Sequence, residues 1–361
     1  MTRSAGQQEA GIERSLFGHL PDGRAVERFA LRATSGLEMQ VSAYGGAILA
    51  LRAPDREGRQ ADVVLGFDRL DDYVADRAYF GVLIGRFANR IRRGRFTLDG
   101  RTYTLPVNDG ANHLHGGPAG FHKVLWRAEP LRENGTVGLR LDYRSPDGEQ
   151  GYPGNLDVTV TYRLTLEGAL VIDYAAETDQ PTPVSLTQHS YFNLSGDPTR
   201  AVLDHELELH ADRFTPVDER LIPTGELASV TGTPFDFRHP ATIGARIGDA
   251  DPRLAQVGGY DHNFVISDGG APLSPAARVH EPVSGRVLEL FTTEPGLQFY
   301  SGNYLDGGAV GKGGTPYRYR TAFCLEPQKF PDSPNHPDFP RCILRPGERY
   351  TSRTVYRFTA E

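Results

Sequence analysis

Short segments of the chain alternate apolar and polar residues with a period of two. The clearest spans Leu156–Leu166, in which every second residue, from Leu156 to Leu166, is apolar. Strict alternation of this kind is typical of a strand with one buried face. Glu167-Gly168 then supplies a turn, and the alternation resumes over Leu170–Tyr174. The pattern therefore predicts a β-hairpin.

The same pattern recurs along the chain. It is present in Phe96–Leu105 around the turn Asp99-Gly100, in Leu207–Leu209, in Val287–Phe291 and in Val355–Phe358. Helical periodicity is scarce, and only Asp68–Ala75 is expected to form a turn or two of helix. Many short strands separated by turn residues indicate an all-β sandwich or barrel.

The chain lacks a repeat of fixed period, which disfavours a propeller, and nothing in it resembles an interdomain linker. The glycine-rich stretch 307–314 is short enough to be a loop within one domain. We therefore predict a single large antiparallel β-sandwich over residues 15–361 with few short helices, preceded by a flexible segment over residues 1–14.

The composition indicates which binding partners are excluded and in which cellular compartment the protein is expected. The net charge of -7, from 46 acidic and 39 basic residues, gives no general attraction to nucleic acid or to anionic membranes. No apolar run reaches the roughly 18 residues of a membrane span, and the first 14 residues are polar. The two cysteines, Cys324 and Cys342, are expected to be buried reduced thiols in a cytoplasmic protein.

Polar residues that are not turn formers cluster at a few places. These are Arg86–Arg90, the histidine pair of Asn112–Gly117, Gln188–Asn193, Gly259–Asn263 and Leu325–Gln328. On a strand, His113 and His115 would face the same side, as in many β-barrel metal sites. An acid such as Glu326 at the end of an apolar strand must be paired, exposed or functional, because burying a bare carboxylate is costly.

Several familiar chemistries are absent from the sequence. It has no Gly-x-Ser-x-Gly elbow, phosphate loop, dinucleotide fingerprint or His-Glu-x-x-His helix, and its cysteines lack zinc-site spacing. What remains is a set of His, Glu, Asp, Asn, Gln and Arg side chains on a β framework, which suits polyhydroxylated ligands. The residues alone leave a sugar site and a metal site open.

At these same clusters the chain resembles the galactose mutarotase (aldose 1-epimerase) family over nearly its whole length. Eight stretches match in the family's order: Gly85–Ile91, Asn112–Gly117, Gly148–Gly154, His189–Leu194, Leu221–Gly225, Tyr260–Phe264, Gln298–Asn303 and Leu325–Asp332. Family members fold as one large antiparallel β-sandwich, in agreement with the alternation. Gln188 and Pro327 depart from the residues that many relatives carry, but neither replaces a proton-transfer group.

The resemblance also implies the roles of individual residues. It assigns His189 as the general acid and Glu326 as the general base of a cofactor-independent and metal-independent mutarotation of aldoses such as galactose or glucose. It assigns substrate binding to further positions, namely Asn89, Arg90, His115, Tyr191, Asp261 and Gln298, with His115 also acting near the ring oxygen. His113 has no role in the family pattern.

Such a reaction needs an ionised Glu326 and a protonated His189. The reference pKa of histidine is about 6.5.

Three alternative functions remain for the chain. One is a non-catalytic sugar-binding protein. Another is an epimerase of hexose 6-phosphates that uses Arg86, Arg90 and Arg92. The third is a metal enzyme that uses His113 and His115.

Overall fold

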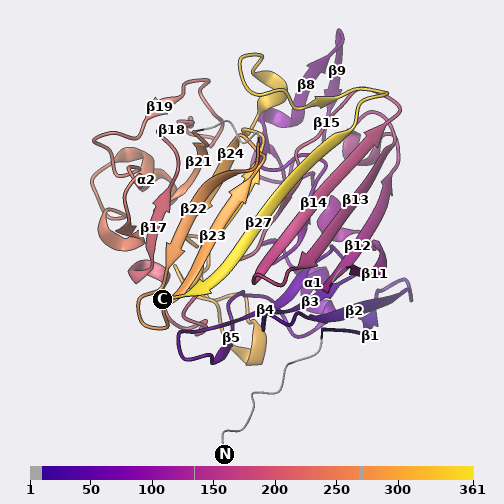
Figure 1. Ribbon diagram of the computed structural model, residues 1–361. Coiled ribbons are helices and arrows are strands. Elements are labelled where there is room, and N and C mark those ends of the chain that lie inside the picture. The colour runs from indigo at the N-terminus through magenta and orange to yellow at the C-terminus, as the bar shows by residue number, and fades with distance from the viewer. Residues whose placement is uncertain (1–9, 134, 268–271) are drawn as a thin grey trace, which may run out of the picture.

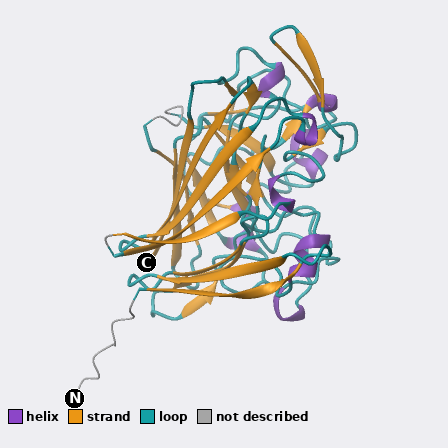
Figure 2. Ribbon diagram, turned by 90° about the vertical axis from the view of Figure 1, so that its right-hand side faces the viewer, coloured by secondary structure: helices purple, strands orange, loops and turns teal. Residues whose placement is uncertain are grey.

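Strands make up most of the regular structure. The computed structural model describes residues 10–133, 135–267 and 272–361, and Figure 1 shows a broad, twisted sheet across the front of the molecule. Seen edge-on in Figure 2, this sheet forms one layer, and most of the short helical segments lie on the side away from it. The arrangement is an antiparallel β-sandwich, as the alternation predicts.

Among the described residues, nine antiparallel strands form the large sheet. In spatial order they are β11 (Arg127–Glu133), β12 (Thr136–Ser145), β13 (Leu156–Leu164), β14 (Ala169–Thr178), β27 (Tyr350–Ala360), β23 (Arg286–Thr292), β22 (Ser274–His280), β17 (Glu206–Leu209) and β20 (Ala241–Thr242). The C-terminal strand β27, yellow in Figure 1, thus occupies the centre of the sheet, between β14 and β23.

Two smaller five-stranded sheets accompany the large sheet. One contains β1 (Gly11–His19), β2 (Ala25–Arg32), β3 (Glu38–Ser42), β4 (Ile48–Pro54) and β5 (Gln60–Asp62). The other, in the order β19-β18-β21-β24-β25, contains β19 (Ala228–Ser229), β18 (Arg213–Phe214), β21 (Asp261–Val265), β24 (Gly296–Tyr300) and β25 (Cys324–Gln328). We refer to this second five-stranded sheet as the site sheet.

Short two-stranded pairs and helical turns connect the sheets. The pairs are β6 (Leu83–Ile84) with β16 (Thr187–Gln188), β7 (Arg90–Ile91) with β10 (His113–Leu114), β8 (Arg95–Leu98) with β9 (Arg101–Thr104), and β15 (Thr182–Pro183) with β26 (Ile343–Leu344). The 3₁₀ turns are η1 (Arg92–Gly94), η2 (Phe121–Lys123), η3 (Glu149–Gly151), η4 (Val202–Asp204), η5 (Ile243–Ala245), η6 (Lys312–Gly314) and η7 (Ser333–Asn335).

The described residues contain only two α-helices, α1 (Leu70–Ala75) and α2 (Pro252–Val257). Helix α2 has clear boundary signals, because the Asp251 side chain accepts a hydrogen bond from the Arg253 N–H and Gly258 ends the helix in the left-handed conformation. Both helices are far too short for the apolar run that a membrane crossing requires.

The core joins the large sheet to the site sheet. Leu141, Val160 and Ile172 from the large sheet belong to the same buried cluster as Phe299 and Leu325 from the site sheet. Burial of each such side chain contributes about 1.5–3 kcal/mol. The Tyr356 hydroxyl on β27 also donates to the Leu325 carbonyl oxygen at 3.0 Å. These contacts fix β25, which carries Glu326, against the centre of the large sheet.

The predicted hairpin of β13 and β14 is confirmed, with Leu156 opposite Thr178 and Leu164 opposite Leu170. The predicted apolar–polar alternation fails at the end of the segment Leu156–Leu166, because Leu166 lies in the turn and is 48 % exposed. The expected flexible segment 1–14 is wrong for residues 11–14, which pair with β2. Residues 1–9 of that segment lie outside the described residues, and a single domain over residues 15–361 stays a prediction.

Candidate active site

One face of the site sheet carries a cluster of polar side chains. Two rows of aligned residues cross β21, β24 and β25: Asn263–Gln298–Glu326 and Asp261–Tyr300–Cys324. Aligned residues of neighbouring strands face the same side, as do residues two apart on one strand. The opposite face carries residues such as Phe299 and Leu325 into the core. Strand pairing therefore gathers polar residues that lie up to 67 positions apart in the sequence, from Asp261 to Gln328.

His189 reaches this face from the end of β16. Its backbone N–H donates to the Val82 carbonyl at 2.9 Å, and its carbonyl accepts from Gly81 N–H at 2.9 Å. Phe192 then forms bridges with Val64 and Phe323. The segment is therefore held next to the start of β25, and this places the imidazole of His189 over Cys324 and Glu326.

Arg90 lies on β7, Asn89 directly precedes it, and His115 directly follows the paired strand β10. His115 follows the last residue of β10 and has a φ of 51°, and Asn89 has a φ of 63°. The Asn89 N–H donates to Nδ1 of His115 at 3.1 Å. Nδ1 must therefore be the unprotonated nitrogen of a neutral His115, so that its Nε2–H is free to donate. At Gly116 a Cβ would lie 1.7 Å from the Gly85 carbonyl oxygen, so only glycine fits there.

These side chains line a cavity of about 670 Å³. Its walls include Asn89, Arg90, His115, His189, Tyr191, Asp261 and Glu326. They also include residues that the sequence did not single out, among them Tyr79, Asp109 and Tyr304. The cavity thus combines aromatic faces with charged and hydrogen-bonding groups, the mixture that a small polar ligand requires.

His189 and Glu326 face each other in this cavity. Nε2 of His189 lies 3.6 Å from Oε2 of Glu326, and their exposed fractions are 5 % and 2 %. Oε2 of Glu326 has no hydrogen-bond partner among the described residues. The pair is therefore nearly dry, with one carboxylate oxygen available to a ligand.

Burial acts on the two groups in opposite directions. It raises the pKa of Glu326 well above its usual range, and the negative charge of Asp261 raises this pKa further, while Arg90 lowers it. Burial lowers the pKa of His189 to about 4. Burial alone thus favours the neutral form of both groups, whereas mutarotation needs an ionised Glu326 beside a protonated His189.

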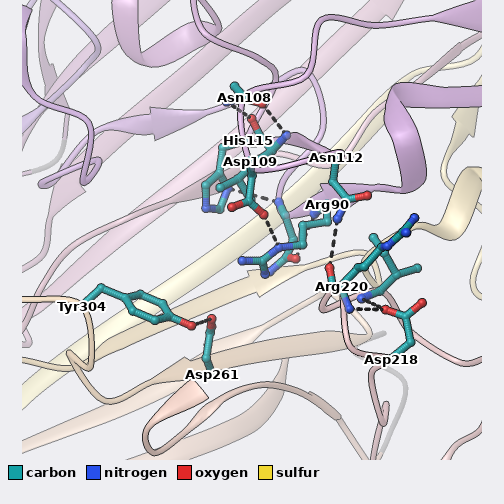
Figure 3. Close-up of polar contacts among 12 residues, drawn as sticks. Arg90, Asn108, Asp109, Asn112, His115, Asp218, Arg220, Asp261 and Tyr304 are labelled. Atoms are coloured by element: carbon teal, nitrogen blue, oxygen red, sulfur yellow. Dashed lines mark hydrogen bonds and ion pairs between the residues drawn. The ribbon is translucent and has the colours of Figure 1, made fainter. Parts of the chain in front are cut away.

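Arg90 provides a buried positive charge in the cavity wall. Its Nε donates to Oδ2 of Asp109 at 2.7 Å, as Figure 3 shows. Burial opposes the charge of Arg90, but Asp261 and Asp109 outweigh this effect and raise its pKa. Arg90 in turn counteracts the rise that burial produces in the pKa of Asp261. Tyr304 completes the group with a contact of 3.4 Å from its hydroxyl to Oδ2 of Asp261.

Seven of the eight predicted site residues line the cavity, and Gln298 is the exception. It is buried beneath Asp261, and its Nε2 donates to Oδ1 of Asp261 at 2.7 Å. Tyr191 stacks on His189 with ring centroids 5.1 Å apart, and its hydroxyl donates to the Ala78 carbonyl.

Tyr79 also lines the cavity but was not predicted from the sequence. Its ring lies 4.8 Å from that of His115. No local pattern marks Tyr79, because its position depends on a loop.

The histidine pair His113 and His115 does not form a joint site. Nδ1 of His113 lies 2.6 Å from the Pro106 carbonyl oxygen, and its Nε2 lies 2.8 Å from the Tyr152 hydroxyl. The expectation that the two rings share a face is wrong, because the strand ends at Leu114 and His115 adopts a left-handed backbone. The group that could hold a metal ion is instead His115, His189 and Glu326, whose ligand atoms lie within 4.8 Å of one another.

The three arginines considered for phosphate binding, Arg86, Arg90 and Arg92, do not lie together in one site either. The buried Arg86 guanidinium donates to Ser145 and to the carbonyl oxygens of Pro146 and Pro153, so it holds the fold together. Arg92 is exposed and does not line the cavity. Of these three arginines only Arg90 lines the cavity, whose wall also includes Arg77. Arg86, Arg90 and Arg92 therefore do not form a joint phosphate site.

Comparison with known proteins finds relatives that match nearly the whole chain. The model of the aldose 1-epimerase family matches residues 27–357. Galactose mutarotase of Bos taurus is 48% identical over 349 residues, which cover 96% of this chain and 98% of that protein. Aldose 1-epimerase of Escherichia coli strain K12 is 42% identical over 344 residues, which cover 94% of this chain and 97% of that protein.

Solved structures show the same fold. The galactose 1-epimerase of Lactobacillus acidophilus superposes with a TM-score of 0.86 at 26% identity, over 98% of this chain and 99% of that one. An aldose epimerase homologue from C. elegans superposes with a TM-score of 0.82 at 32% identity, over 97% of this chain and 99% of that one.

Proposed function

The chain belongs to the aldose 1-epimerase family, and on that basis we propose that it interconverts the α and β anomers of free aldohexoses such as D-galactose and D-glucose. The observation that carries this proposal is the buried His189–Glu326 pair, 3.6 Å apart on one wall of a polar cavity. Two proton-transfer groups are all that the reaction demands, since no bond to a leaving group is broken and no electrons are exchanged.

In the proposed reaction, Glu326 takes the proton of the anomeric hydroxyl while Nε2 of His189 donates a proton to the ring oxygen. The bond from C1 to the ring oxygen breaks, and the open-chain aldehyde rotates about C1–C2. The ring then closes on the other carbonyl face, with His189 as the base and Glu326 as the acid. Protons and electrons balance, and both residues return to their starting states.

The charge state of the His189–Glu326 pair is compatible with these reaction steps if the two groups are treated as one titrating unit. A neutral His189 beside a protonated Glu326 holds the same number of protons as the ion pair. One proton transfer from Glu326 to Nε2 of His189 converts the first state into the second. Sugar hydroxyls that hydrogen bond to the carboxylate, and the positive charge of Arg90, favour the ionised form.

The other cavity residues are assigned to substrate binding. Nε2–H of His115 donates to the sugar near the ring oxygen, since its Nδ1 is engaged by Asn89. Arg90, Asn89 and Asp261 bind hydroxyl groups, and Tyr191 forms an aromatic wall beside His189. Gln298 acts on the sugar through Asp261, because it lies behind that carboxylate.

A cytoplasmic location is also part of this proposal. Cys324 and Cys342 are both buried and free, and reduced thiols are usual in the reducing cytosol. Fractionation of the source cells with a periplasmic and a cytosolic marker enzyme tests this assignment.

Polarimetry of freshly dissolved α-D-galactose tests the proposed activity. The protein should shorten the approach to the anomeric equilibrium in proportion to its concentration. Methyl α-D-galactoside has no anomeric hydroxyl proton, so it should inhibit competitively without reacting. Glucose 6-phosphate should compete poorly, because the cavity holds only one of the three candidate arginines. A rate no faster than buffer would overturn the proposal, and strong competition by glucose 6-phosphate would favour the phosphorylated substrate class.

A further inference from the structure

The second nitrogen of the His189 ring faces a thiol. Sγ of Cys324 lies 3.7 Å from Nδ1 of His189, within hydrogen-bond range for sulfur. Both side chains are buried. Cys324 is not among the residues that line the cavity, so it cannot act on the sugar directly and can act only through His189.

A single strand therefore contacts both nitrogens of the imidazole. Cys324 and Glu326 stand two residues apart on β25, so their side chains project from the same face. Cys324 lies at Nδ1, and Glu326 lies 3.6 Å from Nε2. The faces of the ring are flanked by Tyr79 and Tyr191, whose rings stack on it at 6.0 and 5.1 Å. Of these neighbours, only Cys324 forms a hydrogen-bond contact with Nδ1.

We propose that Cys324 is a positioning residue for the mutarotation, whose sulfur accepts the Nδ1–H bond of His189 and leaves Nε2 as the nitrogen that exchanges protons. This inference rests on the proposed function, in which Nε2 donates to the ring oxygen and later accepts a proton. A neutral histidine carries its proton on one nitrogen only, and the partner of that nitrogen decides which one. With the proton held at Nδ1, Nε2 is free to receive a proton from Glu326.

The chemistry of a buried thiol agrees with this role. Burial raises the pKa of the Cys324 thiol well above its usual range, and the charge of Glu326 raises it further, so the sulfur remains neutral. A neutral sulfur is a weak acceptor, so it orients the ring without adding a charge that would hold His189 permanently protonated. A carboxylate at the same place would stabilise the imidazolium and oppose proton release at Nε2.

The opposite hydrogen bond would have a different consequence. If the thiol donated its proton to Nδ1, the neutral ring would carry its proton on Nε2. Nε2 would then have no lone pair to accept the proton of Glu326, and only Nδ1, which faces the thiol, could take up a further proton. The two arrangements therefore predict different tautomers in the wild-type protein, and a spectroscopic measurement distinguishes them.

Nitrogen-15 NMR of the histidine side chains in the wild-type protein, assigned with His189→Asn, is the first test. The proposal predicts that neutral His189 is protonated at Nδ1, and protonation at Nε2 would overturn it.

The second test compares Cys324→Ala with Cys342→Ala. The Cys342→Ala variant is the control, because it removes the other buried thiol outside the cavity. In Cys324→Ala, kcat for galactose should fall about 10-fold with KM unchanged, the lower end of what loss of a histidine's orienting partner costs in metal sites. Its His189 signals should show mixed tautomers.

Cys342→Ala should keep the wild-type kcat and tautomer, and Cys324→Ser should recover part of the lost rate, because a hydroxyl can also accept from Nδ1. Thermal unfolding of each variant separates a loss of fold from a loss of orientation. Equal kcat values for Cys324→Ala and Cys342→Ala would overturn the proposal. A wild-type rate in His189→Asn would instead overturn the proposed function, and the tautomer measurement on the wild-type protein does not depend on that rate.

Discussion

Nε2 of His189 lies 3.6 Å from Oε2 of Glu326, and both side chains are almost completely buried. At this separation neither group titrates alone, so the protonation of the pair has to be considered as a whole. Besides the Nδ1–H of His189, the catalytically competent pair holds one exchangeable proton. A second proton would block the base, and removal of the last proton would leave no acid.

The shifted pKa values predict a wide pH range of activity. Because burial lowers the pKa of His189 to about 4, the pair gains its second proton only near that pH. The raised pKa of Glu326 moves the loss of the last proton to higher pH. The rate kcat/KM should therefore remain flat through pH 6.5 and fall on the acid side only toward pH 4. Polarimetry in overlapping buffers measures this profile, and an acid limb centred near pH 6.5 would contradict the assignment.

Loss of the hydrogen bond from Gln298 to Asp261 should weaken the binding of the sugar. Gln298→Met keeps the length of the side chain but removes the donor, so the carboxylate of Asp261 loses the partner that orients it. A hydrogen bond to a charged group contributes about 1.5–3 kcal/mol, so KM for galactose should rise about 10-fold or more. The value of kcat should change less, since Gln298 does not touch the reacting atoms. A fall in kcat at constant KM would show that Gln298 acts on proton transfer instead.

Chelation distinguishes the proton-transfer reaction from a metal-dependent one. Dialysis against EDTA should leave the rate unchanged, because Glu326 and His189 carry both protons. Added Zn²⁺ should inhibit, since two histidines and one carboxylate with ligand atoms within 4.8 Å of one another suit this ion. Loss of activity on chelation, with recovery on addition of Zn²⁺, would establish a metal enzyme.

The buried histidines predict a loss of stability in mild acid. Burial lowers the pKa of six of them: that of His113, His189 and His205 to about 4, that of His122 and His262 to about 3, and that of His115 well below its usual value. Their unfolded forms gain protons below about pH 6.5 whereas the folded forms do not, so acid favours unfolding. The stability contributed by their neutral burial is complete above pH 6.5 and declines as the pH falls toward 4.

Between pH 7 and pH 5.5, the free energy of unfolding should decrease by about 1 kcal/mol for each such histidine. Denaturant titrations at the two pH values measure this difference. Equal midpoints and slopes at both would mean that these rings are protonated in the folded protein.

Local alternation predicted the strands but not their partners. The β13–β14 hairpin could be predicted because a short turn of four residues joins strands that are neighbours in the sequence. The central position of β27 could not, because its pairing with β14 and β23 joins segments far apart in the chain. Alternation also could not show that residues 11–14 pair with β2, because that part of the chain is polar.

The site was predictable to the extent that family motifs carry it. His189 and Glu326 are unremarkable in the pattern of the chain, and their proximity results from the pairing of β16 with β6 and of β25 with β24. The spacing of Cys324 and Glu326 on a strand could have revealed their shared face. The divergence of His113 and His115 could not have been foreseen, because it depends on where β10 ends and on the left-handed backbone of His115.

The most direct test of the central assignment is the polarimetric rate of Glu326→Gln. The amide has nearly the size of the carboxyl group but cannot accept the anomeric proton, so the acceleration of galactose mutarotation should vanish. Calorimetric titration with methyl α-D-galactoside should still show binding, which proves that the cavity is intact. A near-wild-type rate in Glu326→Gln would contradict the account.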